Sequence, residues 1–235
     1  MVQNHMSRLA APKCWQILKK ENKWVIRSSC GPHPLYQSIP ITLLLREYLG
    51  YAKNYKEVKS MLQDKEVLIN NKVIHDTGYP VGLMDILDIP KLKETYVVFF
   101  NKKEKIVLKK IESTNIHLLK IKRKNTVKKG KVQITFHNGM NLLFDKSKEK
   151  IGDSVLFNFR EKKIEDILPL KKNSLIYFCG GSNVGRFGKV KEIIEYKNKT
   201  KEISCDIEGK EYISLLENLF VINDHIKNIM EQDGK

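Results

Sequence analysis

The sequence has few of the features that mark a secreted, zinc-binding or membrane protein. Its four cysteines, Cys14, Cys30, Cys179 and Cys205, are widely spaced and form no C-x-x-C pair. We therefore expect free thiols, no zinc site and a reducing, intracellular environment. No run approaches the roughly 18 uncharged apolar residues of a membrane span. The first residues also lack the apolar core of a secretory signal. These absences predict a soluble intracellular protein with no membrane partner.

Acidic side chains are also in short supply. The 235 residues contain 27 Asp and Glu against 43 Lys and Arg, a formal net charge of +16. Residues 93–172 carry +12 of that charge and residues 1–40 carry +5, whereas 41–92 are neutral and 173–235 carry −1. A positive field favours polyanions, because each phosphate neutralised by Lys or Arg releases condensed counterions. A membrane surface would require a basic amphipathic helix, which the basic stretch does not resemble. The charge therefore favours nucleic acid.

Catalytic motifs are missing as well. The six histidines are scattered without H-x-x-x-H spacing, and no G-x-S-x-G occurs. The glycine-rich segment 179–188 is no P-loop, because Lys189 is followed by Val190 where a P-loop has Ser or Thr. It also misses the G-x-G-x-x-G spacing of dinucleotide sites. The sequence predicts no enzyme, no cofactor and no metal.

The pattern of the chain predicts several small modules of an α+β, mostly β protein. Residues 1–40 read as an irregular arm, and residues 41–92 as a compact α+β module with helices at 41–49 and 55–63 and a hairpin at 67–74. Period-two strands at 96–100, 106–110, 116–121, 131–136, 141–144 and 154–159 predict a basic central β-domain over 93–172. Further strands predict a last β-domain over 173–222, before a polar tail at 223–235.

Two segments are candidates for contact with a polyanion. Seven of the twelve residues from 120 to 131 are basic and none is acidic, so their mutual repulsion calls for an external anion. The glycines of 179–188 stand between predicted strands and allow close approach of the backbone to a partner. Asn183, Arg186 and Lys189 would then project toward phosphates or an exposed base. The basic side chains of the first segment are Lys120, Lys122, Arg123, Lys124, Lys128, Lys129 and Lys131.

Seven short strings, taken in order, resemble the S4e family of eukaryotic and archaeal small-subunit ribosomal proteins. Any one of them is weak, but their colinearity over residues 7–222 is specific. The strings are Arg8-Leu-Ala-Ala-Pro-Lys13 with Trp15; Gly31-Pro-His33; Pro40 with Leu44-Leu-Arg46 and Tyr51-Ala52; Asp76 with Tyr79-Pro-x-Gly-x-Met-Asp-Ile86; His137-Asn-Gly139; Gly180-Gly-x-Asn-x-Gly-Arg-x-Gly188; and Asn218-Leu-Phe-Val-Ile222.

The resemblance implies a fold and a function. The fold would comprise the N-terminal arm, an RNA-binding module of the ribosomal-protein-four type, the central β-domain and a KOW-type SH3-like barrel. The function would be that of a structural constituent of the small ribosomal subunit, bound to its rRNA and to neighbouring small-subunit proteins without forming homo-oligomers. The resemblance also implies a cytoplasmic ribosome, with nucleolar assembly in a eukaryote. The sequence stops soon after Ile222, where members of the family carry a longer basic tail, so we expect a truncated member.

The resemblance further assigns RNA-binding roles to residues outside the two basic candidates. Arg8, Lys13 and His33 would serve the arm, and Arg46, Lys53 and Lys56 the helical pair. Gly180, Asn183, Gly185, Arg186 and Gly188 would form the KOW loop. The alternative function is a free RNA-binding or transcript-elongation factor built from the same modules, which would be found outside ribosomes. An RNA-modifying enzyme would need a catalytic domain for which no segment is free.

Overall fold

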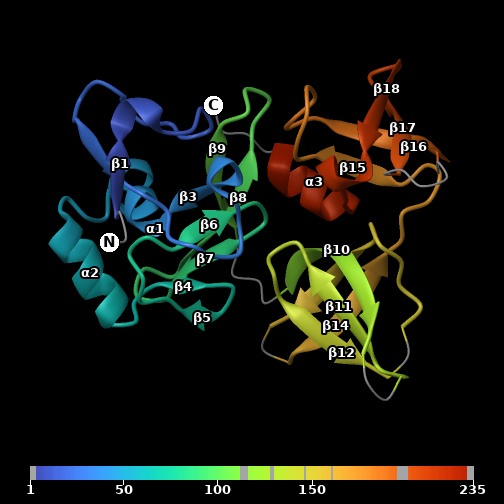
Figure 1. Ribbon diagram of the computed structural model, residues 1–235, viewed down its shortest axis with the longest axis horizontal. Helices are drawn as coiled ribbons and strands as arrows, with labels where there is room; N and C mark the ends of the chain where they lie inside the picture. The colour runs from blue at the N-terminus through green and yellow to red at the C-terminus, as the bar shows by residue number, and fades with distance from the viewer. Residues whose placement is uncertain are drawn as a thin grey trace. The chain divides into compact units, whose positions relative to one another are not determined.

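A computed structural model describes residues 4–111, 116–127, 130–145, 147–159, 161–194 and 201–231. The chain divides into two compact units, Met1–Asn115 and Ile116–Lys235. In Figure 1 the first unit runs from blue to green and the second from yellow-green to red. The fold is mostly β with few helices, as the sequence predicts.

The first unit is built on a five-stranded antiparallel sheet in the order β5-β4-β7-β8-β9. Its hairpin β4–β5 turns at Asn70 and Asn71, whose φ angles of 50° and 59° are those of a tight two-residue turn. A two-stranded sheet β3–β6 and a two-stranded sheet β1–β2 complete the unit. The strands are β1 (His5–Ser7), β2 (Trp24–Ile26), β3 (Ser38–Pro40), β4 (Leu68–Ile69), β5 (Lys72–Val73), β6 (Pro80–Gly82), β7 (Ile86–Ile89), β8 (Glu94–Phe100) and β9 (Ile106–Ile111).

Two helical segments lie between β3 and β4. The first begins after Pro40 and consists of α1 (Ile41–Leu43) and the π-helical turn η3 (Leu44–Tyr48). Gly50, with φ of 70°, ends it, because glycine adopts that conformation without steric cost. In α2 (Tyr55–Gln63) the carboxylate of Glu57 accepts hydrogen bonds from the backbone N–H groups of Lys53 and Asn54, which caps the helix. Both helices match the sequence prediction.

The N-terminal segment is part of the first unit and not a separate irregular arm. Trp15 is buried, and its indole Nε1–H donates to the carbonyl of Ser38 at 2.7 Å. The backbone N–H of Ile106 donates to the carbonyl of Cys14 at 2.9 Å. Strands β8 and β9 belong to the sheet of this unit, whereas the sequence analysis grouped them with the central domain. Pairing between β7 and β8 joins them to the α+β module, so the module extends past residue 92.

The second unit contains two five-stranded antiparallel sheets. The central sheet has the order β12-β11-β10-β13-β14 and a core that includes Ile121, Phe136 and Phe157. The C-terminal sheet has the order β18-β17-β16-β15-β19 around Ile176, Val190 and Cys205. The elements are β10 (Ile116–Thr126), β11 (Val132–Phe136), β12 (Asn141–Phe144), β13 (Ser154–Asn158), β14 (Lys163–Leu168), β15 (Leu175–Phe178), β16 (Phe187–Ile194), β17 (Glu202–Ile207), β18 (Lys210–Leu215), η5 (Leu216–Asn218), β19 (Leu219–Val221) and α3 (Asp224–Glu231).

Strands β6, β14 and β19 and part of the basic run differ from the sequence prediction, as do β1, β2 and β3 in the N-terminal segment. Strands β6, β14 and β19 are short or lie in polar sequence. They can be recognised only from their backbone pairing with neighbouring strands. The basic run was expected between strands, yet its first half continues β10 through Thr126. Backbone pairing with β11 extends the strand there despite the like charges of its side chains.

Candidate nucleic-acid interface

The basic run presents two cations from one irregularity of strand β10. The pairing of β10 with β11 shifts register between Ile121 and Arg123, which is a β-bulge. A bulge interrupts the strict alternation of faces. Ile121 is therefore buried in the core while both Lys122 and Arg123 are exposed. Neither has a carboxylate partner among the residues that the structure describes. Two adjacent exposed cations on a rigid strand are a suitable contact for phosphates.

Lys120 is not available to an RNA ligand, which corrects the sequence prediction. Only 6% of this residue is exposed. Its ammonium donates to the carbonyls of Leu216 at 2.7 Å and Glu217 at 2.9 Å and lies 5.3 Å from the ring centroid of Phe220. Burial lowers the pKa of Lys120 to about 8. Lys120 thus joins the central sheet to the C-terminal sheet.

The remaining basic residues of the run fall into three groups. The ammonium of Lys124 donates to the carbonyls of Ser147 and Glu149, both at 2.9 Å, and its side chain is half-buried, so its bonds are made within the fold. Lys131 is exposed and lies 3.4 Å from the carboxylate of Asp145, which is itself exposed. Such a surface pair is weak and gives way readily to an external phosphate. Lys128 and Lys129 lie outside the described residues.

The glycine-rich loop is a tight excursion between β15 and β16. The N–H of Gly185 donates to the carbonyl of Phe178 at 2.9 Å, and the N–H of Phe178 donates to the carbonyl of Arg186 at 3.0 Å. Gly185 has a φ of 75°, which requires glycine. The loop holds Arg186 and Lys189 exposed and Asn183 half-buried. The side chains of Arg186 and Lys189 are therefore accessible from solvent.

Close packing explains why glycine occupies two positions of the segment 179–188, Gly180 and Gly188. A Cβ atom at Gly188 would lie 2.8 Å from the carbonyl oxygen of Asp206, and one at Gly180 would lie 2.5 Å from the side-chain oxygen of Asn218. Both distances are too short for real Cβ contacts. These glycines allow close packing of the loop within the C-terminal sheet, so their role does not depend on a ligand.

Arg8 is a structural residue in the first unit, another correction to the predicted site. It is 3% exposed, and its guanidinium binds both carboxylate oxygens of Glu47, at 3.0 and 2.7 Å. Its Nε–H donates to the carbonyl of Leu18 at 2.6 Å, and Glu21 lies 3.3 Å away. A bidentate pair of this kind ties the N-terminal segment to the helical segment.

His33 is also buried and cannot reach RNA as predicted. Its Nε2 lies 2.9 Å from the Oδ2 atom of Asp85. Asp85 further accepts hydrogen bonds from the side chain of Asn70 at 2.7 Å and from the N–H of Gly82 at 2.9 Å. Burial by itself would raise the pKa of Asp85, but the charge and hydrogen bond of His33 and those two donors hold it below its usual value. This network fixes the turn before β7.

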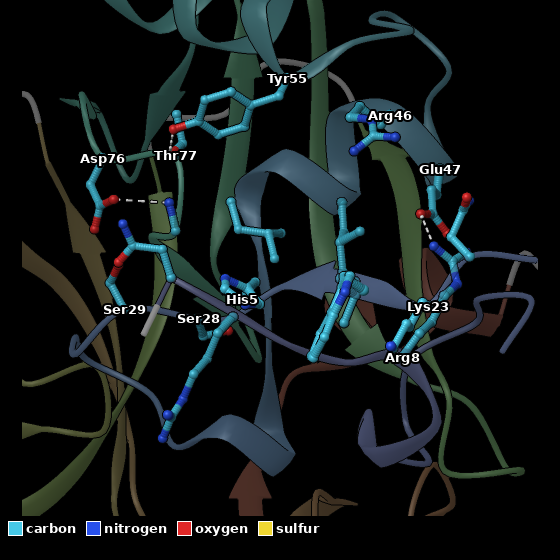
Figure 2. A pocket seen from close by; sticks show the side chains of 18 of the residues that line it. His5, Arg8, Lys23, Ser28, Ser29, Arg46, Glu47, Tyr55, Asp76 and Thr77 are labelled. Carbon is cyan, nitrogen blue, oxygen red and sulfur yellow. Dashed lines mark hydrogen bonds and ion pairs between the residues drawn. The ribbon is translucent and has the colours of Figure 1, made fainter. Parts of the chain in front are cut away.

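The other predicted residues of the first unit differ in exposure. Lys13, Lys53 and Lys56 are exposed. Arg46 is half-buried and lines a cavity of about 1090 Å³ beside β2. Figure 2 shows Arg46 and Tyr55 on one side of this cavity and His5, Lys23 and Ser28 on the other.

Most residues of this cavity carry no local sequence signal of a binding site. Trp24 is exposed, whereas Trp15 is buried, and the sequence gives both tryptophans similar basic neighbours. Tyr55 was read only as the first residue of a helix. Because the cavity joins segments separated by tens of residues, no local pattern could have revealed it.

The described part of the chain contains no cluster of three or more His, Cys, Asp or Glu side chains suited to a metal ion. Among the same residues, no helix is both long enough and apolar enough to cross a membrane. What the described residues do present is exposed basic side chains on packed β-sheets.

Two family models match the chain: the model described as ribosomal family S4e over residues 92–164, and the model of the RS4NT domain over residues 2–36. The small ribosomal subunit protein eS4 of Methanosphaera stadtmanae is 36% identical over 221 residues, which is 93% of this chain and 91% of that protein. The chain belongs to the S4e family. It is therefore a structural constituent of the small ribosomal subunit and not an enzyme.

Other comparisons agree with this S4e assignment. The eS4 protein of Methanocaldococcus jannaschii is 34% identical and is covered over 94% of its length, so the expected truncation is not seen against these relatives. The crystal structure of the 30S ribosomal protein S4e from Thermoplasma acidophilum has a similar fold. Its TM-score is 0.66 at 24% identity, over 80% of this chain and 95% of that one. Family membership implies the cytoplasmic ribosome and favours a ribosomal constituent over a free elongation factor.

Proposed function

We propose that this S4e protein holds folded regions of small-subunit rRNA together through separate cationic surfaces on its modules. The observation that carries this proposal is the exposed pair Lys122 and Arg123, held on a rigid strand without a carboxylate partner among the described residues. Arg186 of the glycine-rich loop and Lys189 of β16 form a second surface, and Lys53 and Lys56 at the start of α2 form a third.

Several weak contacts on one chain act together. Once one module is bound, linkage raises the effective concentration of the next contact without any new interaction. Lys and Arg bind phosphates without reading sequence, so the register on the RNA comes from the shape of the folded rRNA and its 2′-hydroxyl groups. We also infer that the first unit acts as a module of the ribosomal-protein-four type and the C-terminal sheet as a KOW-type SH3-like barrel. Neighbouring small-subunit proteins would be the remaining partners, with no homo-oligomer and with nucleolar assembly in a eukaryote.

Sedimentation tests the proposal directly. In a sucrose gradient of cell extract, we expect the protein in the small-subunit fraction and retained there at moderate salt. Recovery only at the top of the gradient would instead indicate a free RNA-binding factor.

Removing both cations of the β10 bulge should change the salt dependence of RNA binding. For the double variant Lys122→Ala and Arg123→Ala, we expect the slope of log binding constant against log salt to fall by about two, roughly one for each lost phosphate contact. The measurement is titration of small-subunit rRNA at several salt concentrations.

The matched control removes the same charge elsewhere in the second unit. Lys172 and Lys191 are already paired with Glu192 and Glu211, so their double alanine variant should leave the slope nearly unchanged. Equal slopes for the β10 variant and the wild type would show that Lys122 and Arg123 face solvent in the complex.

Arg186 provides a test of the glycine-rich loop. Because Arg186 is exposed, Arg186→Ala should leave the fold intact. Loss of one charge-assisted contact should weaken association with the subunit about tenfold. Retention on small subunits during washes of rising salt measures the effect, with Lys210→Ala, an exposed change at the β17–β18 turn, as control. Unfolding of the Arg186 variant, seen by circular dichroism, would assign Arg186 to packing instead.

A further inference from the structure

The cavity of the first unit is lined by two residues whose buried polar atoms have no hydrogen-bond partner among the described residues. It lies beside strand β2 and the helical segment 41–48 and has a volume of about 1090 Å³. Arg46 Nε and Ser28 Oγ both belong to residues that line it, both are buried, and neither has a hydrogen-bond partner among the described residues. Buried polar groups in folded proteins are almost always paired. Arg46 and Ser28 therefore bring to the cavity polar groups that are not fully engaged by hydrogen bonds among the described residues.

Two exposed aromatic side chains line the same cavity, Trp24 and Tyr55, of which Tyr55 is labelled in Figure 2. Trp24 is 53% exposed and Tyr55 is 47% exposed. Trp24 is held by an edge contact with His5, at 4.9 Å between ring centroids. The hydroxyl of Tyr55 lies 3.0 Å from Thr77 Oγ1, which orients its ring. Rings that are fixed and still accessible provide a surface on which an unstacked base can stack.

The unneutralised charge of the cavity is positive. Its cations include Lys23, Arg27 and Arg46, none of which is paired with a carboxylate among the described residues. The two carboxylates at the cavity are already engaged within the fold. Glu47 binds Arg8, and Asp76 Oδ1 accepts a hydrogen bond from the N–H of Gly78 at 2.9 Å. The cavity therefore favours an anionic occupant over a neutral or basic peptide segment.

We propose that this cavity takes one unstacked nucleotide of the small-subunit rRNA. The base stacks on the exposed rings of Trp24 and Tyr55, and the guanidinium of Arg46, a residue that lines the cavity, donates to an acceptor on the base edge. The phosphate lies at Lys23 and Arg27. The volume, about 1090 Å³, is close to the upper end of the range of about 300–1,000 Å³ that is usual for ligand pockets. This inference rests on the proposed function, because it specifies how one module holds the rRNA.

The test uses intact small subunits that carry the wild-type protein or the variants Tyr55→Ala, Arg46→Gln or Tyr36→Ala. Tyr36 is the matched control, an aromatic residue of the same unit that is 66% exposed and does not line the cavity. Chemical probing of the rRNA at single-nucleotide resolution is the measurement. We expect one nucleotide to become about fivefold or more reactive in the Tyr55 and Arg46 variants, since lost base stacking costs at least that much. The Tyr36 variant should match the wild type.

The outcomes separate this inference from the proposed function. If all variants co-sediment with subunits and no nucleotide changes in reactivity, the cavity holds no nucleotide, while the proposed function stands. If the wild-type protein does not co-sediment, the proposed function itself fails. If Arg46→Gln impairs folding, the exposed Tyr55 and a Trp24→Ala variant carry the test. In irradiated wild-type subunits, a cross-link from the Trp24 peptide to a nucleotide supports the inference. A cross-link to a peptide of another protein overturns it.

Discussion

Replacing His33 by alanine should lower the free energy of unfolding of the first unit by about 3–5 kcal/mol, the cost of removing one partner of a buried ion pair. The substitution leaves the carboxylate of Asp85 buried with only the donors of Asn70 and Gly82. It also leaves an empty space where the imidazole packed. The expected loss is large because Asp85 cannot turn toward solvent from its place between β6 and β7.

Tryptophan fluorescence during denaturant unfolding measures this effect selectively. Both tryptophans, Trp15 and Trp24, lie in the first unit, and Trp15 is buried. His75→Ala serves as control, because His75 is an exposed histidine of the same unit. A His33 variant as stable as the His75 variant would contradict the structural role of the His33–Asp85 pair.

The stability that the His33–Asp85 pair contributes should change with pH in one direction. The pKa of Asp85 is lower in the folded state than in the unfolded chain, where a carboxyl titrates near about 4. The stabilisation from Asp85 is therefore complete above that value and is lost as the pH falls through the folded pKa. The difference between the wild type and the His33 variant should shrink at acidic pH, because Asp85 is then neutral in both.

The second large effect concerns Lys120. Lys120→Ala should destabilise the second unit by about 2–5 kcal/mol, since it leaves the carbonyls of Leu216 and Glu217 without their donor and opens a cavity. Lys122→Ala, two residues along the same strand, should change stability by less than about 0.5 kcal/mol because Lys122 is exposed. The order of the two effects should be reversed when RNA affinity is measured. Lys122→Ala should weaken it, whereas folded Lys120→Ala should not.

The buried thiols of the second unit report its unfolding. Cys179 and Cys205 are both buried, so pulse labelling at fixed pH and increasing denaturant, read by mass spectrometry of the labelled peptides, gives the fraction unfolded. Equal midpoints for the Lys120 and Lys122 variants would show that Lys120 contributes nothing to stability.

A Lys120→Met variant isolates the charge. Burial lowers the pKa of Lys120 to about 8, whereas an unfolded lysine titrates near about 10.4. Between these values the unfolded chain binds more protons, so the wild-type second unit should gain up to about 3 kcal/mol of stability as the pH rises through this window. The methionine variant should lack this gain. Urea unfolding followed by circular dichroism at pH 7.5 and about pH 10 compares the two proteins.

Local sequence signals predicted the elements that depend on neighbouring residues. Pro40 and Gly50 bound the first helical segment, Val58 and Leu62 give α2 its buried face, and Asn70 with Asn71 forms the hairpin turn. The grouping of strands into sheets was less predictable. Strands β8 and β9 alternate in the same way as the strands of the central domain, and only their pairing with β7 assigns them to the first unit.

The same distinction between local and distant contacts applies to the basic residues of the candidate interface. The sequence by itself determined the family, the mostly β modular fold and the excess of positive charge in the middle of the chain. Only the tertiary structure decided which cations remain free. Arg8 meets Glu47 across 39 residues and Lys120 meets Leu216 across 96, so both are buried by partners that no local pattern names. A basic side chain binds RNA only if the folded chain leaves it in solvent, and burial is a property of contacts distant in sequence.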